Sequence, residues 1–278
     1  MTYREGRNMV ADQLAAAGVE NETAESWFLM EAACKINRSY YLIHEQDEMG
    51  PEQEKAYLEL TRRRCQRMPL QYLTGEQEFM GLPFHVNEHV LIPRQDTEVL
   101  VEEAIRIIRQ DLPDAKVLDL CTGSGCIGIS IQSFCPDVTV TGADISQEAL
   151  QVAQKNAVQN QMPVQFIHSD LFAEISDTYD MIVSNPPYIP SEVIETLMPE
   201  VRDHEPMDAL DGKSDGLYFY EKITRQSVEH LKEGGYLLYE IGHDQADAVS
   251  GFMKENGFYD IKVIRDLAGL DRVVTGRR

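Results

Sequence analysis

The chain has 278 residues and a formal net charge of −22 at pH 7, with 43% hydrophobic and 26% charged residues. This composition is typical of a water-soluble globular protein with one large domain or two modest ones. Such an acidic surface repels phosphate groups, which argues against a nucleic-acid substrate that is held by its backbone. The strongest basic run, Arg62–Arg64, is better explained by ion pairs with nearby carboxylates.

The sequence carries no targeting signal and no metal-binding pattern. It has no apolar leader and no run of 18 apolar residues, so we expect a cytoplasmic protein without a membrane segment. The five cysteines form no C-x-x-C pair and are expected to remain thiols. His85 and His89 lie in a stretch that is predicted to be extended, and we expect no metal site.

The first quarter of the chain predicts a small helical domain. Apolar residues recur at helical spacing over residues 3–17, 22–36 and 51–67. None of these helices can bury its apolar stripe alone, so we expect a helical bundle over residues 1–75. The composition then becomes β-type with turn signals, which predicts a β-hairpin linker over residues 76–92.

Strand and helix patterns alternate over residues 93–278, which predicts an α/β domain with a doubly wound, mostly parallel sheet. The two strands nearest the C-terminus are separated only by residues 265–271, too few for a helical crossover, so that pair should be antiparallel. Strands are expected at residues 116–120, 138–143, 164–168, 181–184, 236–241, 259–264 and 272–275, and helices open near 93–98 and cover 127–134, 147–159, 216–231 and 244–255.

A glycine-rich loop follows the first of these strands. Gly123, Gly125 and Gly128 form G-x-G-x-x-G between a strand and a helix, where glycine permits positive φ and close approach of a ligand. Asp144 ends the next strand, where a carboxylate can accept hydrogen bonds from the ribose hydroxyls of an adenosine cofactor. This pattern alone fits a dinucleotide, S-adenosylmethionine, or a tight turn without a ligand. The predicted cofactor-binding residues of the loop are Cys121, Thr122, Gly123, Ser124 and Gly125.

Two further strand ends favour S-adenosylmethionine. Asp170 could bind the adenine amine and Leu171 could pack on the adenine face, after the third strand. The fourth strand ends in Asn185-Pro186-Pro187-Tyr188, which has no role in hydride transfer. In open α/β sheets ligands bind beyond the carboxyl ends of the strands, and all these segments lie at such ends.

The Asn-Pro-Pro-Tyr segment suits the methylation of a planar nitrogen. An amide nitrogen is a poor nucleophile because its lone pair is delocalised. The Asn185 side-chain oxygen and the Pro186 carbonyl can accept its two N–H hydrogens and stabilise the positive charge that it gains. Pro186 and Pro187 fix the backbone, and Tyr188 offers a flat face to the planar group. No separate general base is required, and a rigid turn after a buried strand is the simpler alternative.

The arrangement of these motifs resembles the class I methyltransferases, and more closely the release factor glutamine methyltransferases (the HemK/PrmC family). The resemblance extends over nearly the whole chain. The segments that bear it, besides Asn185–Tyr188, are Thr61–Arg64, Tyr72–Gly75, Glu78–Phe79, Leu91–Glu98, Val201–Pro206, Ala209–Gly212 and Arg272–Arg277.

The resemblance implies methylation of the glutamine amide nitrogen (N5) in the Gly-Gly-Gln motif of peptide chain release factors. S-adenosylmethionine would be the donor and S-adenosylhomocysteine the product. By position, Cys121–Gly125, Asp144 and Leu171 would hold the cofactor, and Asn185–Tyr188 would hold the glutamine. Asn185 is also expected to contribute to the cofactor site. The sequence departs from many relatives at Cys121, where they have glycine.

The helical domain and hairpin would then dock the release factor, and we expect a monomer that binds neither nucleic acid nor membrane. An adenine-N6 nucleic-acid methyltransferase is the main alternative, but flipping a base requires basic strand contacts that a net charge of −22 disfavours. A nucleotide-binding regulator that has lost catalysis is the third reading.

Overall fold

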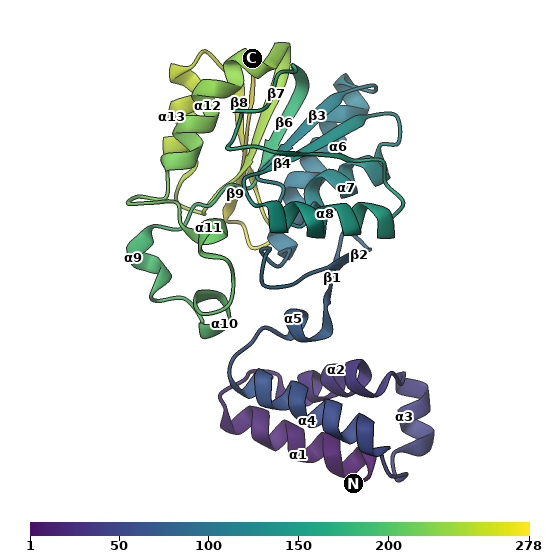
Figure 1. Cartoon of the computed structure of the whole chain (residues 1–278). Coiled ribbons are helices and arrows are strands. Elements are labelled where there is room, and N and C mark those ends of the chain that lie inside the picture. The colour runs from purple at the N-terminus through teal and green to yellow at the C-terminus, as the bar shows by residue number, and fades with distance from the viewer. The chain divides into compact units, whose positions relative to one another are not determined.

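The computed structural model describes all residues from Met1 to Arg278, and they form two compact units (Figure 1). The helical unit comprises Met1–Glu76 and Met198–His204, and the sheet unit comprises Gln77–Leu197 and Glu205–Arg278. The chain therefore returns once to the helical unit, through the short segment at 198–204. No helix in either unit has the length and apolar character that a bilayer span requires.

The helical unit buries one apolar core, which includes Trp27, Met30 and Tyr57. Three of its helices were predicted from helical spacing. The seven-residue helix α3 was not, because Leu42 and Ile43 are exposed and give no apolar stripe. The helices are α1 (Tyr3–Ala16), α2 (Glu22–Cys34), α3 (Arg38–His44), α4 (Pro51–Cys65), α5 (Leu70–Thr74) and α10 (Pro199–Arg202).

Two of the three arginines in the basic run at the end of α4, Arg62 and Arg64, form ion pairs. Arg62 pairs with Glu59 at 2.7 Å on the surface. The guanidinium of Arg64 is buried, and it pairs with Glu25 at 2.5 Å and with Glu200 of α10 at 2.9 Å. Arg67 also pairs with Glu200, at 2.8 Å. Carboxylates from two distant parts of the chain, Glu25 and Glu200, thus neutralise Arg64.

The sheet unit contains seven strands in the order β5-β4-β3-β6-β7-β9-β8. All neighbouring pairs are parallel except the two that include β9, which runs antiparallel to both β7 and β8. The predicted doubly wound sheet with an antiparallel strand near the C-terminus is therefore confirmed. The strands are β3 (Lys116–Leu120), β4 (Thr139–Asp144), β5 (Gln165–His168), β6 (Tyr179–Ser184), β7 (Leu231–Glu240), β8 (Tyr259–Arg265) and β9 (Asp271–Arg277).

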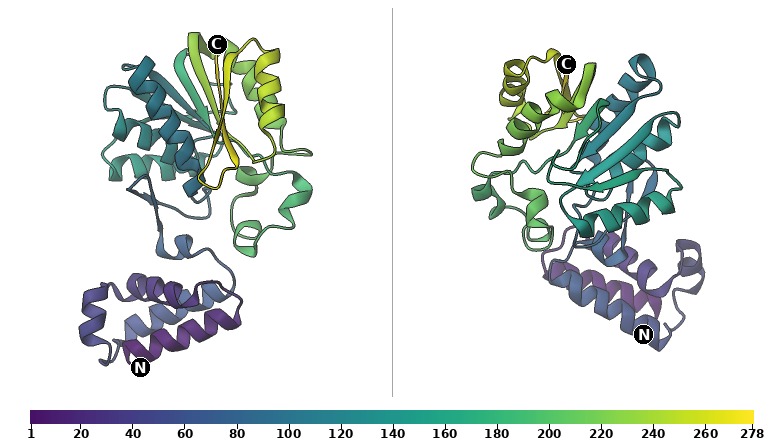
Figure 2. Two further views of the ribbon diagram at one scale, coloured as in Figure 1. Left: turned by 180° about the vertical axis from the view of Figure 1, so that it is seen from behind. Right: turned by 45° about the horizontal axis from the view of Figure 1, so that its top comes forward.

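Helices cover both faces of the sheet, as Figure 2 shows by the blue and teal helices on one side and the yellow-green helices on the other. Side chains alternate between the faces, so Val117 faces one core and Leu118 the other. One face is covered by α6 (Glu98–Asp111), α7 (Cys126–Phe134) and α8 (Gln147–Gln159), and the other by α12 (Tyr218–His230) and α13 (Ala246–Glu255).

A two-stranded hairpin of β1 (Glu76–Phe79) and β2 (Leu82–His85) precedes the sheet. Phe79 and Phe84 are buried in the core beneath α6, so most of the hairpin packs as part of the sheet unit. Asn156 of α8 fixes its end, because its side chain exchanges two hydrogen bonds with the backbone of His85, at 2.7 and 3.0 Å.

The structure corrects two predicted boundaries. The helix expected at 216–231 is α12, which begins at Tyr218, and β7 begins directly at Leu231 rather than at Tyr236. Gly234 and Gly235 therefore lie within β7 instead of ending a helix. A Cβ added at Gly235 would meet the Lys232 carbonyl at 2.9 Å and the Asp180 carbonyl at 3.0 Å, so the close packing of the backbone there favours glycine. The insertion before α12 also holds the one-turn helices α9 (Ser191–Ile194) and α11 (Met207–Leu210).

Candidate active site

A cleft of about 470 Å³ opens at the carboxyl edge of the sheet. Its volume lies within the roughly 300–1,000 Å³ range of small-molecule sites. The strand order places β4, β3 and β6 side by side, so the segments that follow them meet at one edge. The predicted site residues that line the cleft are Cys121, Thr122, Gly123, Ser124, Asp144, Asp170, Leu171, Asn185 and Pro187. Gly125, Pro186 and Tyr188 are not among the lining residues.

The glycines of the loop have different structural roles. Gly123 has φ of +53°, and a Cβ built there would meet no atom within 4 Å, so a ligand can approach its backbone closely. Gly125 has φ of +80°, and its Cβ would lie 2.9 Å from Ile129 and 3.2 Å from Ala153. Gly125 therefore permits helix packing behind the loop, while Gly123 leaves the cleft open.

Cys121 begins the loop in the left-handed region, with φ of +62°. A residue with a Cβ is strained there by about 1–2 kcal/mol, which glycine avoids. Burial raises the pKa of its thiol, so the sulfur remains protonated and unreactive at neutral pH. The backbone conformation is thus one that glycine adopts without strain, and the loop keeps it with a cysteine side chain.

Asp119 is a functional residue that the sequence interpretation missed. It is fully buried near the end of β3, where Oδ2 accepts hydrogen bonds from Thr122 Oγ1 at 2.5 Å and from the Gly128 backbone at 2.9 Å. Its other oxygen has no partner. Burial raises the pKa of this carboxyl to about 7, against the effect of the two hydrogen bonds. Asp119 ties both ends of the loop together and so fixes its shape.

Asp144 lies at the end of β4 with its carboxylate in the cleft. Oδ2 accepts from the Gly123 backbone at 2.8 Å, and Oδ1 accepts from the Ser146 backbone at 2.9 Å. Burial raises the pKa of Asp144, and the backbone hydrogen bonds lower it. Each carboxylate oxygen can accept more than one hydrogen bond, so both remain available to a ligand hydroxyl pair.

The turn after β5 holds Leu171 in a strained conformation, with φ of +52°. Ser169 stabilises this turn, because its hydroxyl donates to the Leu171 carbonyl at 2.7 Å and accepts from the Glu174 backbone at 3.0 Å. Asp170 and Leu171 both line the cleft. The turn therefore presents one acid and one apolar side chain to it.

Asn185 follows β6 and lines the cleft, and its Nδ2 donates to Thr97 Oγ1 at 3.5 Å. Tyr188 instead lies behind the cleft. Its hydroxyl donates to Glu240 Oε1 at 3.3 Å, and its carbonyl accepts from Gln245 Nε2 at 3.0 Å. Burial raises the pKa of Tyr188, so the hydroxyl keeps its proton. The structure thus brings Asn185 and Pro187 to the cleft and anchors Tyr188 to the end of β7.

A layer of charged side chains surrounds this anchor. Arg94 pairs with Glu205 at 2.6 Å, and Arg272 pairs with Asp96 at 3.2 Å and with Asp266 at 3.1 Å. These pairs join the segments 91–98, 201–206 and 272–277, which the sequence interpretation singled out without a structural role. These ion pairs give the three segments a structural role, and Arg94 also lines the cleft.

The cleft also has walls that strand-end reasoning did not predict. They come from the loop before α6, from the insertion that follows β6, and from the first turns of α12. The presence of Lys213 and Lys222 makes part of the wall basic. The residues concerned include His89, Val90, Leu91, Pro93, Arg94, Thr97, Tyr218, Phe219 and Lys222.

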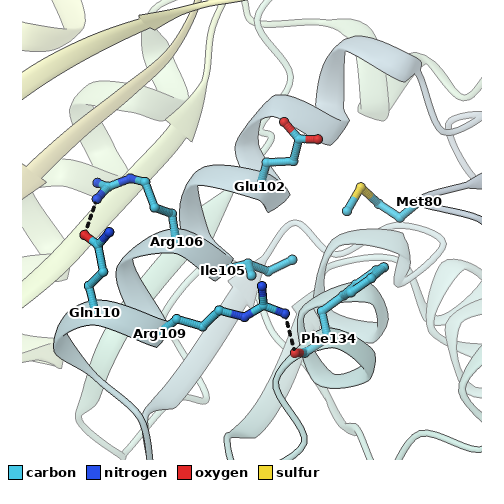
Figure 3. Close-up of a pocket in the computed structure, with 7 residues that line it drawn as sticks. All are labelled: Met80, Glu102, Ile105, Arg106, Arg109, Gln110 and Phe134. Carbon is cyan, nitrogen blue, oxygen red and sulfur yellow. Dashed lines mark hydrogen bonds between the residues drawn. The ribbon is translucent and has the colours of Figure 1, made fainter.

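A second depression, of about 380 Å³, lies on the outer surface of α6 (Figure 3). Its cations already have partners, because Arg106 bonds Glu103 at 2.7 Å and Arg109 bonds the Phe134 carbonyl at 3.2 Å. None of its lining residues follows a strand of the large sheet: Met80, Glu102, Ile105, Arg106, Arg109, Gln110 and Phe134. It lacks convergent free polar groups and is not a candidate active site.

Comparison with known families accounts for both units. Residues 6–75 match the PrmC N-terminal domain, and residues 96–199 match the Methyltransferase small domain. A solved structure of the T. Thermophilus 16S rRNA N2 G1207 methyltransferase in complex with AdoMet and guanosine has a TM-score of 0.52 at 16% identity. The match covers 73% of this chain and 49% of that one, and at this identity it shows a shared fold alone.

Two relatives resemble the chain over almost its full length. One from Geobacter sulfurreducens is 43% identical over 277 residues, which is 99% of this chain and 96% of the relative. One from Fusobacterium nucleatum is 39% identical and covers 98% of this chain and 77% of the relative. Both bear the name release factor glutamine methyltransferase. With its helical unit, its sheet topology and this degree of identity, the chain belongs to the release factor glutamine methyltransferase family.

Proposed function

We propose that the protein transfers a methyl group from S-adenosylmethionine to the side-chain amide nitrogen of the glutamine in the Gly-Gly-Gln motif of peptide chain release factors. The observation that carries the proposal is the presence of Asn185 and the open backbone of Gly123 in a single cleft. The relatives' names supply the substrate, and the solved neighbour was determined with AdoMet.

The residues of the cleft fit S-adenosylmethionine. The empty space beside Gly123 admits a ligand against the backbone, and Asp144 has acceptor capacity for a ribose hydroxyl pair. Asp170 and Leu171 offer the polar and apolar contacts that adenine requires. Thr122, Ser124 and the other loop residues would complete the site. When bound, S-adenosylmethionine supplies a methyl group on a sulfonium, which is already activated for transfer.

The protein's own contribution is to orient the nucleophile. The Asn185 Oδ1 and the Pro186 carbonyl accept the two hydrogens of the substrate amide, which concentrates electron density on its nitrogen. Pro186 and Pro187 hold the backbone, so little conformational freedom is lost when the substrate binds. Tyr188 does not line the cleft and supports the motif through its bond to Glu240. The methylated nitrogen is acidic and needs no dedicated base.

We assign substrate docking to the helical unit. Its helix α3 exposes Leu42 and Ile43, which are 65% and 77% accessible, and such apolar exposure suits a protein partner. The enzyme would act as a monomer in the cytoplasm, without nucleic acid or membrane as partner, consistent with its net charge of −22.

The test is transfer of label from radiolabelled S-adenosylmethionine to a purified release factor, with duplex DNA as the competing substrate. We expect label on the glutamine of Gly-Gly-Gln, located by peptide mass spectrometry. Asn185→Ala should abolish transfer and leave cofactor affinity within about threefold, because the amide acts on the substrate rather than on the cofactor. Label in DNA, or none in the release factor, would reject the proposal.

A further inference from the structure

One buried glutamine side chain joins three segments near the proposed transfer site. Gln245 is 7% exposed and immediately precedes α13. Its Nε2 donates to the Tyr188 carbonyl at 3.0 Å and to the Gly216 carbonyl at 3.3 Å, and its Oε1 accepts from the Gly242 backbone at 2.9 Å. The first partner follows β6, the second precedes α12 and the third follows β7. The amide therefore links the Asn-Pro-Pro-Tyr segment to both of these connections.

The hydrogen bonds of the Gln245 amide determine its orientation. An amide NH₂ group has two hydrogens and no acceptor, and both hydrogens are used on carbonyl oxygens. The opposite orientation would place an oxygen against two carbonyls and an NH₂ group against the Gly242 N–H. Because the side chain is buried, water cannot readily replace any of these partners. Only a donor at this position satisfies the Tyr188 and Gly216 carbonyls together.

Two glycines let the insertion before α12 pack tightly against Tyr188. A Cβ added at Gly212 would lie 2.8 Å from both the Cα and the carbonyl carbon of Tyr188. A Cβ added at Gly216, whose φ is +74°, would overlap the Tyr188 carbonyl oxygen and lie 2.7 Å from Gln245 Nε2. The Gly212 backbone also donates to the Ile189 carbonyl at 2.9 Å. The Tyr188 backbone and the end of the insertion are therefore packed without room for a side chain between them.

The two prolines transmit this constraint to Asn185. Proline fixes its own φ and favours an extended conformation in the residue before it, so the segment from Asn185 to Pro187 is stiff. Its N-terminal end is held by Ser184, which pairs with both β3 and β7. Gln245 holds the opposite end at Tyr188. A stiff segment that is fixed at both ends keeps the Asn185 side chain and the Pro186 carbonyl in one geometry.

The same contact positions one wall of the cleft. The insertion contributes lining residues that we call the insertion wall: Pro206, Asp208, Ala209 and Lys213. Lys213 lies between the two glycines that pack on Tyr188. Gln245 is not among the residues that line the cleft, so it acts only through the segments that it holds.

We infer that Gln245 is a positioning residue for methyl transfer, which fixes the Asn-Pro-Pro-Tyr segment against the insertion wall. The inference rests on the proposed role of Asn185 and Pro186 in transfer. Without the Gln245 amide, the Tyr188 carbonyl loses its donor, and the two acceptors for the substrate amide can shift with the backbone. Gln245 touches no reacting atom, and its effect should therefore appear in the rate of transfer rather than in cofactor binding.

Gln245→Met tests the inference because it keeps an unbranched side chain of similar length and removes the amide. We expect kcat for release factor methylation to fall about 10- to 100-fold, since a displacement of about 1 Å can cost that much. Kd for S-adenosylmethionine should change less than about threefold. Met253→Ala is the control, since it removes a fully buried side chain about two turns further along α13 and lowers stability without removing a hydrogen bond to Tyr188. It should keep kcat within about twofold of wild type at a temperature at which both variants are folded.

Gly216→Ala perturbs the same contact while Gln245 is still present. The added methyl displaces the Tyr188 carbonyl, so kcat should fall in the same range as in Gln245→Met. Gly257→Ala is the matched control, because Gly257 has a similar φ of +85° and no atom within 4 Å of an added Cβ. It carries the backbone strain without the collision and should keep kcat. This pair decides the inference if Gln245→Met does not fold.

Two kinetic outcomes would overturn the inference. In one, folded Gln245→Met or Gly216→Ala retains kcat within about twofold of its control. In the other, affinity for S-adenosylmethionine falls as far as kcat does. Either result would show that Gln245 only stabilises the fold or the cofactor site.

Hydrogen exchange separates this inference from the proposed function. The Ile189 amide donates to the Leu210 carbonyl at 3.1 Å, and the Gly212 amide donates to the Ile189 carbonyl, so both report on the packed contact. Their exchange should be at least about tenfold faster in Gln245→Met than in wild type and Met253→Ala. If wild type does not methylate release factors, the proposed function alone is rejected, and exchange still decides whether Gln245 fixes the segment. Equal exchange in the three proteins would exclude the positioning role.

Discussion

At the scale of single residues, the site depends on backbone conformations and buried charges that by themselves raise the free energy of the folded state. Asp119 is an acid enclosed at the end of β3, and Cys121 and Leu171 hold positive φ without being glycine. Each costs free energy that the surrounding hydrogen bonds and packing offset. Two of these residues lead to predictions on stability.

Asp119 should make the protein less stable as pH rises from about 4 to about 7. Its pKa is raised to about 7 in the folded state, above its ordinary value of 3.8. The folded state therefore binds a proton that the unfolded state releases, and stability falls through this window by an amount on the order of 3 kcal/mol. Asp119→Asn should reduce this loss of stability between pH 4 and pH 7. The free energy of unfolding is measured with urea at pH 4.5 and 7.5. An equal loss of stability in the wild type and in Asp119→Asn would contradict the prediction.

Cys121 should tolerate glycine and reject a β-branched residue. With φ of +62°, Cys121→Gly relieves strain and should leave stability within about 1 kcal/mol of wild type. Cys121→Val should lose about 2 kcal/mol, because β-branched residues are outliers at positive φ. Urea midpoints of the two variants provide the comparison. Equal losses would mean that side-chain packing, and not backbone conformation, governs this position.

At the scale of elements, helix α8 links the hairpin to the glycine loop. Asn156 is fully buried in α8, and besides its two bonds to His85 it donates to the Ser124 carbonyl at 2.9 Å. Local sequence could not reveal this link, because His85 and Ser124 lie far from Asn156 in the chain. The shape of the loop therefore depends on a residue of α8 that does not itself line the cleft.

Asn156→Ala should destabilise the protein by about 3 kcal/mol, since it removes three side-chain hydrogen bonds to the backbone of His85 and Ser124. It should also weaken S-adenosylmethionine binding, because Ser124 loses its support. Asn160→Ala is the control on the same helix, where the side chain donates to the Pro83 carbonyl nearer the surface, and should cost less than about 1 kcal/mol. Urea unfolding and calorimetry test both, and similar losses in the two variants would contradict the link.

At the scale of the whole molecule, the chain divides into two units that do not follow its order. Residues 198–204 pack with the helical unit, although both flanking segments belong to the sheet unit. Glu200 is the polar anchor, since it pairs with Arg64 and Arg67. The folding of this short segment should therefore follow that of the helical unit.

Glu200→Ala should lower the stability of the helical unit by about 2 kcal/mol and increase hydrogen exchange in residues 198–204, because it leaves Arg67 without its carboxylate and Arg64 with only Glu25. The sheet strands β3 and β6 should show no change. Glu59→Ala, which removes the exposed partner of Arg62, should have no measurable effect. Hydrogen exchange with mass spectrometry tests this, and unchanged protection of 198–204 would contradict it.

Much of the architecture was predictable because strand and helix patterns alternate regularly along the sequence. Alternating strands and helices indicated the sheet, and the short connection at 265–271 indicated the antiparallel pair. Strand-end reasoning also placed Gly123, Asp144 and Asn185 at one edge. The partners of Asn185 and Tyr188 were not predictable, because Thr97 and Glu240 lie far from them in the chain. The contact between Glu200 and Arg64 likewise has no local signal.

The reversed direction of β9 has a practical consequence. Its first residues lie at the cleft edge, where the Ile241 backbone donates to the Arg272 carbonyl at 2.9 Å. Its last residues lie at the opposite edge, where Arg278 exchanges hydrogen bonds with Gly234 and Gly235 at the start of β7 (Figure 2). A fluorophore or surface-immobilisation tag fused after Arg278 would therefore emerge on the side of the sheet away from the cleft. Binding assays on a sensor chip can use that attachment without obstructing the methyl-transfer site.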